Sequence, residues 1–80
     1  MNVNEKIGKI IRNARLDKRM TMKDLGKLTG YSEVAIHNYE TGTRGMSLET
    51  FFSICQILDL DVNEVQKQCR EQKKPTSGLL

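Results

Sequence analysis

The sequence predicts an all-α domain made of five short helices. In five successive segments the apolar residues recur three and four positions apart, which is the spacing of one buried helix face. A residue type that commonly caps helix N-termini precedes each of these segments. No segment alternates apolar and polar residues as a half-buried strand does, and the chain contains a single proline. These three observations favour a small helical bundle.

The first helix is predicted to start at Asn2, which can form a capping box with Glu5. Its expected inward stripe consists of Ile7, Ile10, Ile11 and Ala14. The next helix starts at a second box, Thr21 with Asp24, and should run to Thr29. We expect Leu25 and Leu28 on its inward face.

Residues 30–42 predict a tight turn and a third helix. Gly30 can take the left-handed conformation that ends the preceding helix, and Ser32 can cap the next one. That helix should run over residues 33–41 with Ile36 and Tyr39 facing inward, and Gly42 should end it. Two short helices joined by a glycine-containing turn are typical of a helix-turn-helix, whose second helix enters the major groove of DNA.

A loop over residues 42–46 leads to two further predicted helices. Ser47 caps the fourth helix, for which we expect a core stripe of Leu48, Phe51, Ile54, Cys55 and Leu58. Asp61 with Glu64 forms a third possible box, which starts the fifth helix with Val62 and Val65 inward. We expect the folded domain to cover residues 1–72 and residues 73–80 to form a flexible tail or linker.

Charge is unevenly distributed along the 80 residues, whose formal net charge is +3. Residues 1–27 hold eight Lys and Arg against three acids, whereas residues 48–64 hold four acids and no base. A basic end suits a protein that docks on a polyanion. Ordinary solvated helix faces would produce the same pattern, so charge alone leaves both interpretations open.

The composition argues against several other classes of protein. Cys55 and Cys69 are too few for a disulfide framework, and His37 is the only histidine, so neither a metal site nor a cofactor is expected. No apolar run approaches the length of a membrane span, and no signal peptide is apparent. No catalytic constellation is present, so we expect a cytoplasmic protein that is not an enzyme.

A set of residues in a fixed order resembles the Cro/CI, or XRE-type, helix-turn-helix repressors over residues 5–66. The set consists of Gly8, Ile11, Arg15, Thr21, Leu25, Gly30, Ser32, Ile36, Glu40, Gly42, the run Ser47-Leu48-Glu49-Thr50, Leu58 and Val65. The resemblance implies a five-helix lambda-repressor-like DNA-binding domain with the helix-turn-helix at helices 2 and 3. It implies a sequence-specific transcriptional regulator that binds double-stranded DNA, repressor-like and associated with the nucleoid when bound.

The chain departs from the family pattern at several positions. Met22 stands where many relatives have a glutamine that contacts a phosphate, and Gly26 replaces the usual alanine. Asp59 stands where helix 4 commonly ends in glycine. The start of the third helix carries Glu33 and Val34, where many relatives have Gln, Arg or Ser. Because the departures at Met22, Glu33 and Val34 weaken the usual phosphate and base contacts, the alternative is a protein-interaction module on the same fold with weakened or lost DNA binding. The chain could also be the N-terminal domain of a longer regulator.

Four residues of the third helix are the candidate base contacts: Glu33, Val34, His37 and Asn38. Asn38 suits a bidentate contact to adenine, and Val34 can pack on a thymine methyl group. His37 can donate to a base or a phosphate. Glu33 can accept from cytosine N4, or it can simply complement the positive end of the helix dipole.

The candidate contacts to the DNA backbone lie on both sides of that helix. They are the N-terminus of helix 2 at Met22, the side chains of Lys23 and Lys27, and Thr43 and Arg44 in the loop. The resemblance further implies a structural ion pair between Arg15 and Glu40. It also implies a homodimer on DNA, for which Phe52, Ile57 and Leu60 are the candidate interface; completing the core is the other interpretation of these three.

Overall fold

The computed structural model describes residues 2–70, and in this range the chain forms five helices and no strands. They are α1 (Val3–Asp17), α2 (Met22–Thr29), α3 (Glu33–Thr41), α4 (Leu48–Leu58) and α5 (Val62–Arg70). The predicted all-α class is therefore confirmed. The predicted tail, residues 73–80, lies outside the described residues.

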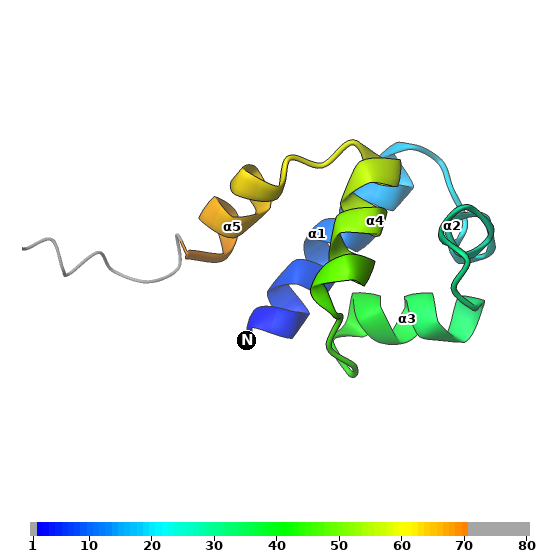
Figure 1. Cartoon of the computed structure of the whole chain (residues 1–80), viewed down its shortest axis with the longest axis horizontal. Coiled ribbons are helices and arrows are strands. Elements are labelled where there is room, and N and C mark those ends of the chain that lie inside the picture. The colour runs from blue at the N-terminus through cyan, green and yellow to red at the C-terminus, as the bar shows by residue number, and fades with distance from the viewer. Residues whose placement is uncertain (1, 71–80) are drawn as a thin grey trace, which may run out of the picture.

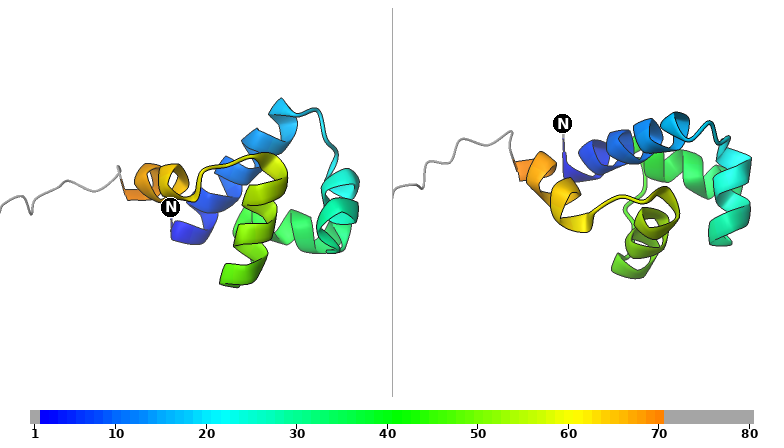
Figure 2. Two further views of the ribbon diagram at one scale, coloured as in Figure 1. Left: turned by 45° about the horizontal axis from the view of Figure 1, so that its top comes forward. Right: turned by 90° about the horizontal axis from the view of Figure 1, so that it is seen from above.

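The helices pack around α1, which contacts α3, α4 and α5. Figure 1 shows α3 along the lower edge of the molecule, with α1 and α4 above it. α2 contacts both α3 and α4 at one end of the molecule, and α5 lies at the other end. The two further views in Figure 2 show the same separation of α2 from α5. The arrangement leaves one long side of α3 without a neighbouring helix.

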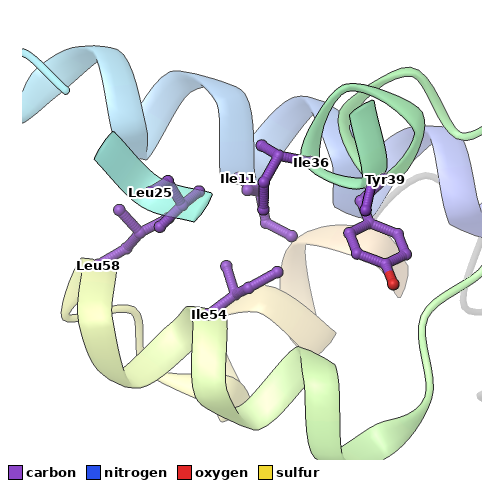
Figure 3. Close-up of a cluster of buried hydrophobic side chains, with 7 residues drawn as sticks. Ile11, Leu25, Ile36, Tyr39, Ile54 and Leu58 are labelled. Atoms are coloured by element: carbon purple, nitrogen blue, oxygen red, sulfur yellow. The ribbon is translucent and has the colours of Figure 1, made fainter. Parts of the chain in front are cut away.

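One hydrophobic core joins the first four helices. Ile11, Leu25, Ile36 and Ile54 are fully buried and come from α1, α2, α3 and α4 respectively. Figure 3 shows these side chains pointing toward one another between the helices, together with those of Tyr39 and Leu58. Burying one such side chain contributes about 1.5–3 kcal/mol, so this cluster fixes how α3 lies against the other helices.

Two of the three predicted capping boxes form, and they set where α1 and α2 begin. The Asn2 side chain accepts from the Glu5 amide at 2.8 Å, and the Glu5 carboxylate accepts in return from the Asn2 amide at 3.0 Å. Thr21 and Asp24 make the same reciprocal box, both bonds being 3.0 Å long. The third box differs, because the Asp61 carboxylate accepts from the Asn63 amide at 2.9 Å.

Two leucines predicted to face inward are exposed instead. Leu28 is 56% exposed, because the buried side of α2 is centred on Leu25 and Gly26 and successive residues turn by about 100°. Leu48 is 67% exposed, because it follows the capping residue Ser47 directly and projects away from the inner side of α4. Both predictions were wrong because three-residue spacing by itself does not define the centre of a helix face.

Candidate nucleic-acid interface

α3 is a short helix with one buried and one exposed side. The Ser32 hydroxyl accepts from the Ala35 amide at 3.0 Å, which starts the helix, and Gly42 ends it with φ of 79°. Both helix ends follow from local chemistry, since a serine caps free amides and a glycine adopts positive φ without strain. The buried side consists of Ala35, Ile36, Tyr39 and Glu40.

The four candidate base contacts lie off that buried side. Val34 is 69% exposed, and Glu33 and His37 are exposed as well. Asn38 is half-buried. Three of the four side chains are therefore uncovered, and α3 itself lies along an edge of the molecule (Figure 1). Ala35, between Val34 and Ile36, is buried at 9% exposure.

A glycine allows α1 to lie very close to α3. A Cβ atom on Gly8 would come within 2.5 Å of the Tyr39 carbonyl oxygen and would also collide with that of Glu40. Both obstacles are main-chain atoms, so only a shift of one helix would relieve them. Gly8 therefore sets the distance between α1 and the C-terminal half of α3.

An ion pair ties the end of α1 to the end of α3. Arg15 donates from Nε to Glu40 at 2.7 Å and from Nη2 to the other carboxylate oxygen at 3.0 Å. A third donor, Nη1, bonds the Met20 carbonyl at 2.8 Å. The side chains are only 6% and 1% exposed, and the bond to Glu40 raises the pKa of Arg15. The pair has little surface left to offer to DNA and serves to position α3.

The loop after α3 is held by hydrogen bonds to the helix itself. The Thr41 hydroxyl donates to the Asn38 carbonyl at 3.2 Å and lies 2.8 Å from the Thr43 hydroxyl. Since the Thr41 proton is used by Asn38, Thr43 is the donor of the second bond. The Arg44 amide also donates to the Asn38 carbonyl, at 3.3 Å. Contact between the Thr43 hydroxyl and a phosphate would require this chain of bonds to rearrange.

Arg44 itself lies at the surface against an aromatic ring. Its guanidinium carbon is 5.6 Å from the centre of the Tyr39 ring, a distance typical of cation–π contacts. The loop protrudes at the same lower edge as α3 in Figure 1. The sequence pattern assigned Tyr39 only to the core, and it missed this second contact. An aromatic residue five positions before the arginine was the available signal, but it says nothing about the path of the loop.

The exposed side of α2 presents both charge signs, with Lys23 and Asp24 in the first turn and Lys27 in the last. Lys23 and Lys27 are exposed, whereas the Met22 side chain packs against the core and leaves only its amide for a partner. Hydrogen bonds from the amide and hydroxyl of Thr21 lower the pKa of Asp24, which is therefore ionised near neutral pH. That carboxylate complements the helix dipole at the end where a phosphate would otherwise be attracted.

The candidate dimer residues lie in different environments. Phe52 is 49% exposed on α4, one turn after the exposed Leu48. Ile57 and Leu60 are half-buried and pack against the core. Cys55 is buried, and burial raises the pKa of its thiol.

The described part of the chain, residues 2–70, lacks two features of other protein classes. No three His, Cys, Asp or Glu side chains in it come together as a metal site would require. None of its helices combines the length and the apolar character needed to cross a membrane.

Comparison with known proteins agrees with this geometry. The helix-turn-helix family model matches residues 11–65, which is more than half of the chain. A search of curated protein sequences gives no match. The clp gene regulator ClgR from Corynebacterium glutamicum has a similar structure, with a TM-score of 0.82 and 25% identity over 90% of this chain and 77% of that chain.

A second similar structure is the restriction-modification controller protein C.AhdI from Aeromonas hydrophila. Its TM-score is 0.71 at 26% identity, over 76% of this chain and 92% of that chain. Both proteins are regulators by description, and the helix-turn-helix family consists of DNA-binding regulators rather than enzymes. From the motif, the exposed side of α3 and these matches, we conclude that the chain belongs to the XRE-type helix-turn-helix family of DNA-binding transcriptional regulators.

Proposed function

We propose that this regulator represses transcription by occupying an operator with α3 in the major groove. The observation that supports the proposal is that one side of α3 is buried and the other is exposed. Ile36 has no exposed surface, whereas Val34, two positions earlier, is 69% exposed. A helix anchored by one side and bare on the other can enter a groove without disturbing the core.

Three of the candidate residues on α3 suit particular features of the DNA. Asn38 pairs with adenine N6 and N7, and Val34 packs on a thymine methyl group. His37 donates to a base or to a nearby phosphate. For Glu33 we favour a role at the positive end of the helix dipole over a contact to cytosine, because its carboxylate would repel the phosphates beside it.

Contacts to phosphate would hold α3 in register from both sides. Lys23 and Lys27 on α2 supply cations on one side, and the Met22 amide supplies a helix N-terminus. The loop supplies Arg44, and also Thr43 once its bond to Thr41 has rearranged. Such contacts position the protein on any duplex without reading its sequence.

The regulator would bind as a dimer, because one helix reads only a few base pairs. Two copies of α3 would occupy half-sites about 34 Å apart. Phe52 is the candidate interface residue with the most exposed surface, and the exposed Leu48 extends it along α4. Ile57 and Leu60 would contribute only their outer atoms, since both also pack on the core. The site of action would be the nucleoid in the cytoplasm.

Selection of duplexes from a random pool tests these points together. We expect a palindromic consensus, with an affinity that falls as salt rises at a slope near −0.9 per phosphate neutralised. A dimer would show two copies per site in sedimentation of the complex. Absence of duplex binding even at low salt would contradict the proposal and favour the protein-interaction module.

A further inference from the structure

The guanidinium of Arg44 is held in place without being neutralised. It lies over the Tyr39 ring with 5.6 Å between the guanidinium carbon and the ring centre. The ion pairs within residues 2–70 are Arg15–Glu40 and Lys18–Asp59, so no carboxylate in that range pairs with Arg44. A ring face attracts the cation but offers its N–H groups no oxygen or nitrogen lone pair. The charge and the donors therefore remain available to an anion.

The Tyr39 ring, over which Arg44 lies, is itself held in place by its other neighbours. Tyr39 is 6% exposed and lies in the core cluster, as Figure 3 shows. The Tyr31 ring meets it edge to face, with 6.0 Å between centres and 89° between planes. The Tyr31 hydroxyl lies 2.9 Å from the hydroxyl of Thr50, which is buried at the start of α4. The position of the Tyr39 ring is thus fixed by α3, by the α2–α3 turn and by α4.

The main chain of Arg44 is attached to the same helix. Its amide donates to the Asn38 carbonyl at 3.3 Å, one position before Tyr39. An arginine at the tip of a loop ordinarily loses much side-chain freedom when it binds a phosphate. Here both ends of the residue are already oriented on α3, so less freedom is left to lose.

We propose that Tyr39 is a positioning residue for DNA binding, which holds the Arg44 guanidinium at the edge of α3 for contact with a phosphate oxygen. This role rests on the proposed function, because it assumes that Arg44 meets the DNA backbone. An exposed cation–π contact is weak, so its loss should reduce affinity about two- to fivefold per bound subunit. Tyr39 would act through Arg44 and would not touch the DNA.

The test is a double-mutant cycle on a selected duplex. Dissociation constants are measured for Tyr39→Phe and Tyr39→Leu, each alone and combined with Arg44→Gln, over a range of salt concentrations. Phe keeps the ring face, so Tyr39→Phe should bind within about twofold of the wild type. Tyr39→Leu should lose about two- to fivefold alone and nothing further when combined with Arg44→Gln.

The control is Ile36→Val, which trims a buried side chain of α3 that does not belong to the proposed contact. It should leave DNA affinity unchanged while lowering stability. A loss from Tyr39→Leu of equal size in both Arg44 backgrounds would reduce Tyr39 to a structural role and overturn the inference. Failure of the wild-type protein to bind any duplex would instead refute the proposed function.

A measurement on the wild-type protein keeps the inference testable if Tyr39→Leu does not fold. In the free protein, NMR should show the Arg44 side-chain protons shifted upfield by the ring current. The order parameter of Arg44 Nε should exceed that of Arg12, an exposed arginine of α1 that has no ion pair among residues 2–70. Equal order parameters and unshifted protons would overturn the inference.

Discussion

Two arginines contact α3 near its C-terminal end, in contrasting ways. Arg15 lies in the interior, where Glu40 accepts two of its N–H groups and the Met20 carbonyl accepts a third. Arg44 lies at the surface over the Tyr39 ring, and no carboxylate of residues 2–70 pairs with it. The charge of Arg15 is therefore neutralised within the fold, whereas that of Arg44 remains available to a polyanion.

The contrast teaches that counting basic residues does not identify a DNA-binding surface. Both arginines raise the positive charge of the sequence equally, yet only Arg44 presents its N–H groups at the surface without a carboxylate partner among residues 2–70. What distinguishes them is the group that each guanidinium meets, a carboxylate or an aromatic ring. Four substitutions test this distinction and the surroundings of α3, and their expected effects decrease in size.

Removing the buried guanidinium should have the largest effect. Arg15→Ala leaves the Glu40 carboxylate buried without its partner, so the free energy of unfolding should fall by about 3–5 kcal/mol. Urea denaturation followed by circular dichroism measures the loss. Lys18→Ala is the matched control, because it breaks the exposed Lys18–Asp59 pair and should cost less than about 1 kcal/mol. Weaker DNA binding at unchanged stability would place Arg15 at the DNA instead.

Removing the exposed guanidinium should show the reverse pattern. Arg44→Gln should leave the melting temperature almost unchanged but weaken binding about tenfold per subunit at low salt. Because one phosphate contact is lost, the salt slope should become shallower by about 0.9 per subunit. Fluorescence anisotropy at several salt concentrations measures both quantities. Arg12→Gln removes the same charge from α1, and an identical change in slope there would show that only net charge matters.

Neutralising Glu33 separates the two interpretations of the acid at the start of α3. If the carboxylate serves the helix dipole, Glu33→Gln should lower stability by about 0.3–1 kcal/mol and strengthen binding to every duplex. If it reads cytosine, discrimination at one base pair should fall instead, by about 1–3 kcal/mol. We expect the first result. Glu49→Gln is the control, because it changes the same kind of site on α4, away from α3.

The smallest expected effect concerns the acid limit of stability. Hydrogen bonds from Thr21 lower the pKa of Asp24 in the folded state. Its contribution is therefore complete above the unfolded pKa, about 3.9, and is lost as pH falls through the lower folded value. Asp24→Asn should flatten the acid side of the profile of melting temperature against pH. Profiles of equal steepness in the two proteins would contradict this assignment.

The helix boundaries were predictable because they depend on neighbours in the chain. The box of Asn2 with Glu5 and that of Thr21 with Asp24 formed as the sequence pattern predicted. Each cap bonds an amide only three residues away, so no distant part of the chain has to be known. The exposure of Val34 and the burial of Ile36 were predictable for a similar reason, since they follow from the helical period.

The errors arose where the packing of other helices decides the outcome. Leu28 fits the spacing of an inward residue, yet Gly26 faces the Tyr31 carbonyl and rotates Leu28 toward solvent. For Ile57 and Leu60 the sequence left a dimer interface and the core both open, and in the structure they pack against the core. In each case the sequence supplies the periodicity, whereas the orientation of the helix determines which apolar residue is covered.

By itself, the sequence determined the helical class, the ends of the helices and the spacing of the helix-turn-helix, because these properties arise from bonds within a few residues. Only the tertiary structure decided which charges remain usable. Arg44 reaches the Tyr39 ring because Gly42 turns the loop back onto α3, and Arg15 meets Glu40 because Gly8 lets α1 approach closely. Such contacts depend on the mutual orientation of helices, which no local pattern specifies.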